Sequence, residues 1–253
     1  MPDLTYFPLH ATAVVAIYNL PTSVRSGAVL AVDGRVICAI MRGNITYWDH
    51  PWIKALNPTM NWNGIVNKEI TVLGQLSGGS TNYAFTSVCN KIDPMYAAMG
   101  ILPSTNPNYP THLYAKYQSF STLDDVNSAI SDIEWSIGIS LWNNALTIDA
   151  PLANFVTPSG EVISPTVESA QLTLFELATS GYNDGYGFDL TVPTTPRAWP
   201  ALTMNYLYIN KASTRTTCAT KKMMVRQRGE VHMMTSFLSS QFSIPSLCSN
   251  IRL

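Results

Sequence analysis

The sequence has few charged residues, and none of its apolar runs is long. Only 12% of its 253 residues are Asp, Glu, Lys or Arg, and the formal net charge is −1. So small a charge gives no electrostatic attraction for nucleic acid. The longest apolar run, 13–18, has the length of a strand, whereas a helix that crosses a membrane needs about 20 apolar residues. Few Lys and Glu with many Ser, Thr and Asn are more typical of secreted or surface-exposed proteins than of cytosolic ones.

Signatures of enzymes and metal sites are also missing. No C-x-x-C pair occurs, the histidines are scattered without an H-E-x-x-H pattern, and no G-x-S-x-G elbow exists because Gly74 stands three residues before Ser77. Asp124-Asp125 could form an acid–base pair, but on a helix it is more typical of a cap. The stretch 183–189 resembles a calcium loop without its acidic spacing, which favours a turn. We therefore expect no catalysis, metal or cofactor.

The four cysteines, Cys38, Cys89, Cys218 and Cys248, permit three full pairings. Cys218 and Cys248 lie in the same C-terminal segment and could form a disulfide in a secreted protein, while buried free thiols are the alternative. Asn44-Ile45-Thr46 is an N-glycosylation sequon, which has meaning only in a eukaryotic secretory pathway.

Apolar patterns, caps and breakers predict alternating strands and helices. The predicted strands are 13–18, 28–32, 70–74, 136–140, 153–156 and 203–209. The predicted helices are 35–41, 49–56, 80–91, 122–132, 166–180 and 215–239. In the last of these, apolar residues at helical spacing would form a core face, and the basic residues would face solvent. The alternation predicts an α/β sandwich.

The segment 71–87 carries the pattern of an anion site. A β-branched strand runs into a Ser/Gly loop, which opens directly into an amphipathic segment. Unpaired amides at a helix start, the positive end of the helix dipole and short hydroxyl donors favour a small oxyanion. The candidate ligand-binding residues are Gln75, Ser77, Gly78, Gly79, Ser80 and Thr81. An ordinary cap and turn is the alternative interpretation of this loop.

Several motifs in order give the chain a family resemblance. They are 14–21, G-N-I-T-Y-W-D-H-P-W-I-K-A-L-N-P at 43–58, S-G-G-S-T-N-Y-A-F-T-S at 77–87, I-G-I-S at 137–140, S-G-E-V-I-S-P-T at 159–166 and W-P-A-L-T at 199–203. Together they resemble the PstS-like phosphate-binding proteins of ABC uptake systems, which are type II periplasmic binding proteins. The resemblance covers about residues 7 to 211. It implies two lobes joined by a hinge, with a ligand in the cleft between them.

The resemblance also implies where each lobe lies and where the protein acts. Residues 20–197 would form the second lobe with the anion loop, whereas 1–19 and 198–253 would form an incomplete first lobe. The family's N-terminal stretch, which supplies the other half of the phosphate site, has no counterpart here, and Met1-Pro2-Asp3 does not look like a signal peptide. A transporter or another chain would then cover the exposed edge of the first lobe. Family resemblance places the protein in the periplasm, at the cell surface or outside the cell.

The family's charged pair is replaced in this loop. An Arg and an Asp that grip phosphate in the family correspond to Gln75 and Ser77, so binding should be weak and should discriminate poorly between phosphate and sulfate. We expect a solute-binding domain for phosphate or a similar oxyanion. The alternative is a degenerate fold that serves as an extracellular interaction or structural module without ligand.

Overall fold

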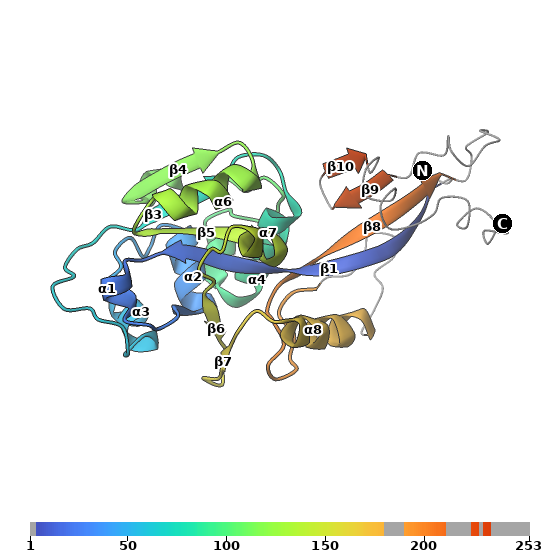
Figure 1. Cartoon of the computed structure of the whole chain (residues 1–253). Coiled ribbons are helices and arrows are strands. Elements are labelled where there is room, and N and C mark those ends of the chain that lie inside the picture. The colour runs from blue at the N-terminus through green and yellow to red at the C-terminus, as the bar shows by residue number, and fades with distance from the viewer. Residues whose placement is uncertain (1–3, 180–189, 211–223, 228–229, 234–253) are drawn as a thin grey trace. The chain divides into compact units, whose positions relative to one another are not determined.

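The computed structural model describes residues 4–179, 190–210, 224–227 and 230–233. Helices and strands alternate through most of this part of the chain (Figure 1). The helices are α1 (Thr22–Arg25), α2 (Gly34–Met41), α3 (Pro51–Leu56), α4 (Ser80–Ile92), α5 (Pro94–Ala98), the 3-10 turn η1 (Thr111–Leu113), α6 (Leu123–Asp132), α7 (Trp142–Thr147) and α8 (Val167–Thr179). The strands are β1 (Leu4–Asn19), β2 (Ala31–Asp33), β3 (Thr71–Gln75), β4 (Lys116–Phe120), β5 (Ser136–Leu141), β6 (Asn154–Val156), β7 (Val162–Ile163), β8 (Leu202–Asn210), β9 (Met224–Gln227) and β10 (Glu230–Met233).

The chain divides into two compact units. The larger comprises residues 11–203, and the smaller comprises residues 1–10 and 204–253. In the described part of the smaller unit the strand order is β10-β9-β8-β1, and β9 pairs antiparallel with both β8 and β10. Strands β1 and β8 each have residues in both units. The lobe boundaries expected at 19/20 and 197/198 both fall within the larger unit, and the assignment of lobes stays a prediction.

The larger unit is built on a sheet with the strand order β1-β5-β3-β4. Strand β3 runs parallel to β4 and β5, whereas β1 runs antiparallel to β5. A second sheet has the order β2-β6-β7. Parallel strands need crossover connections, and helices α4 and α6 lie in those between β3, β4 and β5. The α/β fold predicted from the sequence is confirmed.

Strand β5 shows how the sequence places helices on both faces of this sheet. Along 136–141 small residues alternate with large aliphatic ones, and all six are buried. The aliphatic side belongs to a core cluster shared with α2 and α4. On the other side α6 packs closely, because the Ser140 hydroxyl donates to Asn127 at 2.6 Å and a Cβ on Gly138 would lie 3.3 Å from Val126. The pattern S-I-G-I-S-L therefore specifies a strand that is covered on both faces.

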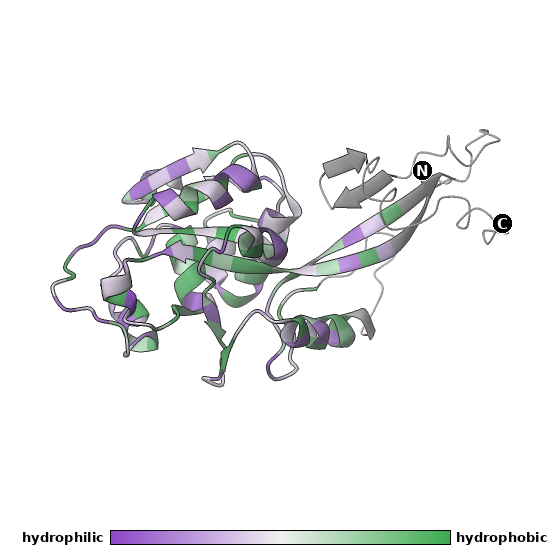
Figure 2. Cartoon of the chain, viewed as in Figure 1, coloured by the Kyte–Doolittle hydropathy of each residue, from purple (hydrophilic) through white to green (hydrophobic). Residues whose placement is uncertain are grey.

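A disulfide joins the two helices on the aliphatic side. Cys38 of α2 and Cys89 of α4 are bonded, and both side chains have no exposed surface. Figure 2 shows apolar residues concentrated on α2 and the central part of β1, while β4 at the sheet edge is largely hydrophilic. The sequence left the pairing of the four cysteines open, and the structure pairs Cys38 with Cys89. Cys218 and Cys248 lie outside the described residues.

Most elements predicted from the sequence are confirmed. Each predicted strand overlaps an observed one, although β1 begins nine residues earlier than expected. The predicted helices at 35–41, 49–56, 80–91, 122–132 and 166–180 correspond to α2, α3, α4, α6 and α8. The predictions missed β4, β7, α1, α5 and α7, which are short. Strand β4 is polar and mostly exposed, so it lacks the apolar alternation that reveals a strand.

The predicted C-terminal helix at 215–239 is wrong where the structure describes it. Residues 224–227 and 230–233 are strands β9 and β10, which pair antiparallel with Gln227 opposite Glu230. Only Arg228 and Gly229 separate the strands in the sequence, and two-residue connections that contain glycine are typical of β-hairpins. The spacing of seven between Met224 and Val231 fits a helix, but the glycine between them was the stronger signal. The rest of that range lies outside the described residues.

The buried side chain of Asn57 ties α3 to β2. Its Oδ1 accepts from the Ala31 amide at 2.7 Å, and its Nδ2 donates to the carbonyls of Ala31 at 2.8 Å and Ile53 at 2.9 Å. Asn57→Ala is expected to lower the free energy of unfolding by about 3 kcal/mol, because three buried backbone groups lose their partner. Urea denaturation measures this. The exposed Asn63→Ala is the control, and equal effects of the two substitutions would contradict the role given to Asn57.

Candidate functional site

The candidate loop lies at the carboxyl edge of the parallel strands. Strand β3 ends at Gln75, the loop 76–79 follows, and α4 begins at Ser80. Because β4 and β5 run parallel to β3, the connections from β4 to α6 and from β5 to α7 start at the same edge. In open α/β sheets this edge is the usual place for ligands. Figure 1 shows α4 leading away from this edge.

Some amides of the loop are already used within the fold. The Leu76 amide donates to Phe120 at 2.8 Å, the Ser77 amide to Ser121 at 3.3 Å, and the Gly79 amide to Thr105 at 2.9 Å. Within the part of the chain that the structure describes, no acceptor pairs with the remaining amides. These are the amides of Gly78, Ser80, Thr81 and Asn82. They are unpaired N–H donors in the first turn of α4 and in the loop that precedes it. The positive end of the helix dipole lies there.

The side chain of Ser80 is the most unusual polar group of the loop. Ser80 is 5% exposed, and its hydroxyl is buried without a hydrogen-bond partner among the described residues. Thr81 is 3% exposed. Leaving a buried hydroxyl unpaired costs about 1–3 kcal/mol, so such groups are uncommon unless a water or ligand pairs with them. The cap residue Gly79 has no side chain to pair with the helix start.

Gln75 and Ser77 form a neutral hydrogen-bonded pair at the start of the loop. The Gln75 Nε2 donates to the Ser77 Oγ at 2.8 Å. Ser77 therefore keeps its own O–H as a donor. The Gln75 amide also lies beside Gly79, where a Cβ would come within 3.3 Å of it. The pair gives the loop donors and a fixed shape, but it adds no positive charge.

Two neighbours of the loop were not predicted from the sequence. The Thr105 carbonyl accepts from the Gly79 amide and, at 3.2 Å, from the Asn82 side chain. Tyr117 of β4 lies directly over Gly74, so that a side chain at Gly74 would collide with the phenol ring, and burial raises the pKa of Tyr117. Thr105 comes from a loop without periodic pattern, and only Asn82 in the first turn of a helix hinted at a polar contact.

The chain is similar in sequence to several known proteins. No protein-family model matches the chain. Over 212 residues it is 26% identical to the phosphate-binding protein PstS of Haemophilus influenzae, in a match that covers 83% of this chain and 60% of that protein. Over 228 residues it is 23% identical to R831 of Acanthamoeba polyphaga mimivirus, which is named as a serine/threonine-protein kinase/receptor, with 86% of this chain and 14% of that protein covered. The chain thus spans less than two thirds of the length of these relatives.

Solved structures show the fold. A DING protein superposes with a TM-score of 0.55 at 16% identity, over 84% of this chain and 61% of that chain. The phosphate-bound periplasmic phosphate-binding protein PfluDING superposes with a TM-score of 0.53 at 17% identity, over 81% and 57%. The chain has a PstS-like fold. The resemblance inferred from the sequence motifs is confirmed at this level.

Most residues of the motifs that indicate the PstS-like fold have a structural role. Trp48 has no exposed surface, and its indole donates to the Trp135 carbonyl at 2.9 Å. The Thr86 hydroxyl donates to the Asn82 carbonyl at 2.7 Å within α4, and the Trp199 indole donates to the Val14 carbonyl at 2.8 Å. These residues form hydrogen bonds within the protein and are therefore structural.

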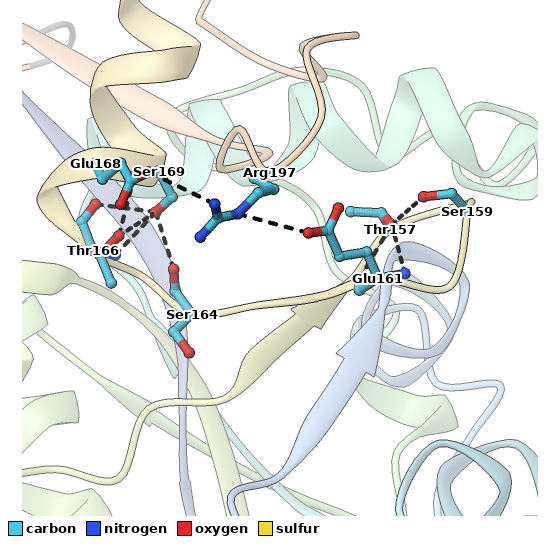
Figure 3. Close-up of polar contacts among 8 residues, drawn as sticks. All are labelled: Thr157, Ser159, Glu161, Ser164, Thr166, Glu168, Ser169 and Arg197. Atoms are coloured by element: carbon cyan, nitrogen blue, oxygen red, sulfur yellow. Dashed lines mark hydrogen bonds and ion pairs between the residues drawn. The ribbon is translucent and has the colours of Figure 1, made fainter.

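A second polar cluster of the larger unit contains Arg197, whose guanidinium is a candidate cation for an anionic ligand. Figure 3 shows its guanidinium between two carboxylates, at 3.7 Å from Glu161 and 3.8 Å from Glu168. The side chain is 62% exposed, so solvent screens these pairs strongly. The hydroxyls in the cluster bond to one another or to the backbone, as Ser169 does with Ser164 and Thr166. Arg197 therefore has two acidic neighbours, and no contact in the described residues links it to the loop 75–81.

The other polar groups weighed from the sequence have structural partners. Thr122 and Asp125 form the predicted capping box at the start of α6, and Asp124 accepts from Asn144 at 3.1 Å. His10 contacts Asn205 at 2.6 Å, and burial lowers the pKa of His10. No group of three or more His, Cys, Asp or Glu side chains could hold a metal ion in the described ranges. The described helices also include none with the length and apolar character needed to cross a bilayer.

Proposed function

We propose that this chain is a solute-binding domain that binds phosphate or a similar oxyanion weakly at the loop 75–81. The buried, unpartnered hydroxyl of Ser80 is the observation that carries the proposal. It lies at the same helix start as the unpaired amides of Gly78, Thr81 and Asn82. An oxyanion oxygen placed there would accept from several donors at once. The relatives named for phosphate binding support the choice of ligand.

The ligand would be held by donors without a balancing cation. Ser77, Ser80 and Thr81 supply hydroxyls and Gly78 supplies an amide, while Gln75 fixes Ser77. A hydrogen bond to a charged group contributes about 1.5–3 kcal/mol, so the absence of an Arg weakens binding by one to two orders of magnitude. The Ser77 oxygen is the local acceptor for the proton of hydrogenphosphate. Phosphate and sulfate should therefore bind with similar, weak affinity.

The same proposal includes the lobes of the protein, its partner and its location. Residues 20–197 form the second lobe, and 1–19 with 198–253 form part of the first. The partner of the first lobe is a transporter component, another chain or a further segment of the same protein. The location is the periplasm, the cell surface or the exterior, as PfluDING is named periplasmic. The domain binds a solute and does not turn it over. Absence of phosphatase activity in the purified chain checks that point.

An interaction module without ligand is the second candidate. Two relatives of this chain are named as kinase/receptors, and the match covers only 14% and 11% of them. In this alternative the chain is a recognition module of the kind that could be attached to other parts of a longer protein. The neutral Gln75–Ser77 pair fits a site that no longer needs an anion.

Calorimetric titration with phosphate, and with sulfate as the comparison, separates the two candidates. Ser77→Ala with Thr81→Ala abolishes the binding heat of a solute binder and leaves partner binding by an interaction module unchanged. Ser80→Ala tests the site more directly than this double variant does. It should stabilise the ligand-free protein by about 1 kcal/mol, because an unpaired buried hydroxyl is removed. It should also weaken anion binding by about tenfold. The control is Ser87→Ala on the same helix, whose hydroxyl donates to the Tyr83 carbonyl. Unchanged affinity in Ser80→Ala would reject the proposed site.

A further inference from the structure

The turn that ends α2 presents Asn44 at the surface in a defined conformation. The Gly43 amide donates to Ile40 at 3.0 Å and the Asn44 amide to Ala39 at 2.9 Å, the two bonds of a Schellman motif. Gly43 has a φ of +75°, and a Cβ there would lie 2.6 Å from the Cβ of Leu113. Both features require glycine at this position. The backbone of Asn44 is therefore fixed, and its side chain projects from the end of the helix.

The side chain of Asn44 is exposed, and its side-chain amide has no hydrogen-bond partner among the described residues. The next residue, Ile45, is 1% exposed and anchors the turn in the core. Thr46 is half-buried, and its backbone carbonyl accepts from the Ile70 amide at 2.8 Å, so its side chain is not needed for that contact. Asn44-Ile45-Thr46 is the only N-x-Ser/Thr sequon without proline in the sequence. Asn57-Pro58-Thr59 has the spacing but contains proline.

The helix that carries this turn also carries a disulfide. Cys38 lies six residues before Asn44 and is bonded to Cys89 in the core. Disulfides persist mainly in secreted, extracellular or lumenal proteins. Proteins of this kind that pass through a eukaryotic secretory pathway are glycosylated at Asn sequons on the way. The exposed sequon and the disulfide are both compatible with passage through a eukaryotic secretory pathway.

We propose that Asn44 is an N-glycosylation site. This inference rests on the proposed location together with passage through a eukaryotic secretory pathway, and it does not depend on anion binding. The co-reactant is an oligosaccharide on a lipid diphosphate: a bond forms between Asn44 Nδ2 and the anomeric carbon, the bond from that carbon to the diphosphate oxygen breaks, and the amide nitrogen loses one proton. The glycan would cover the neighbouring apolar surface of Tyr47 and Leu113, which are 40% and 42% exposed.

The experiment secretes the full chain from a eukaryotic cell behind an added signal sequence and measures its intact mass before and after peptide-N-glycosidase treatment. The mass increment of one glycan, removed by the enzyme with conversion of residue 44 to aspartate, is expected. N44Q and T46A should both lose the increment, and T46S should retain it. Circular dichroism and the absence of free thiol at Cys38 and Cys89 show that each secreted form is folded.

Pro58→Ala is the matched control, because it creates a second sequon at Asn57, which is 3% exposed and fully hydrogen-bonded. A glycan at Asn57 cannot coexist with these contacts, so the secreted yield should fall severalfold. Secreted, folded and oxidised wild-type protein without a glycan would overturn the assignment of Asn44 while leaving the proposed location intact. Phosphate titration of the glycosylated and deglycosylated forms reports on the anion site separately.

Discussion

Loss of the Cys38–Cys89 disulfide is expected to lower the free energy of unfolding by about 4 kcal/mol, given the 51-residue separation of the two cysteines. The bond joins α2 to α4, and both sulfurs are buried in the aliphatic core. Its removal returns conformational freedom to the unfolded chain between them, which includes the loop 76–79. Most small proteins have a total stability of only about 5–15 kcal/mol, so this loss is a large share of the total.

The measurement is urea denaturation of the C38A/C89A double variant and the wild type, followed by far-UV circular dichroism. The wild type unfolded and refolded in the presence of a reductant is the control, because it lacks the bond but keeps both side chains. Reduced wild type should resemble the double variant, apart from the small cavities that Ala leaves. A difference below about 1 kcal/mol between oxidised wild type and both forms without the bond would contradict the expected role of the disulfide.

Restoring the family's charged pair is expected to raise phosphate affinity by about ten- to a hundredfold, as a charged hydrogen bond worth about 1.5–3 kcal/mol would. Gln75 and Ser77 already contact each other at 2.8 Å, and both lie at the mouth of the loop. In Q75R/S77D an arginine and an aspartate would occupy these places, and the arginine would bring a permanent positive charge to the orphan amides of Gly78 and Ser80. The prediction rests on the proposed anion site.

Calorimetry with phosphate and sulfate separates the two substitutions. Q75R alone should strengthen the binding of both anions, whereas the double variant should favour phosphate, because the carboxylate introduced at position 77 accepts the proton of hydrogenphosphate and repels sulfate. Q118R adds the same charge on the exposed side of β4 and is the control for general electrostatic attraction. An equal increase in anion affinity in Q118R and Q75R would show that the added charge acts at long range. That result would contradict the assignment of the loop as the binding site.

Strand and helix predictions succeeded where a segment is buried on a defined face. Segment 136–141 alternates small and large residues and forms β5 between two helix layers. Segment 116–120 forms the edge of the sheet and is mostly exposed, so it can be polar. It therefore lacks the apolar alternation by which a strand is predicted from sequence. The C-terminal prediction failed because an apolar spacing of seven residues fits a helix, whereas β9 and β10 pair with each other as antiparallel strands. Local spacing does not record which segments pair.

The candidate site was predictable in its loop but not in its partners. The strand, glycines and helix start at 71–87 were visible in the sequence and are observed as β3 and α4. The sequence did not show that the Thr105 carbonyl takes the Gly79 amide or that the Ser80 hydroxyl has no partner among the described residues. Both facts depend on how the loop that contains Thr105 packs against α4, and this loop has no periodic sequence pattern.

The sequence by itself determined the α/β class, the order of its motifs and the absence of a charged pair at residues 75 and 77, since these follow from local patterns and residue identity. Only the tertiary structure decided that Cys38 pairs with Cys89, which amides of the loop the fold uses and that Arg197 lies within ion-pair distance of two glutamates. Each of these depends on contacts between residues distant in the chain. Such contacts are fixed when the core packs, and no local pattern specifies them.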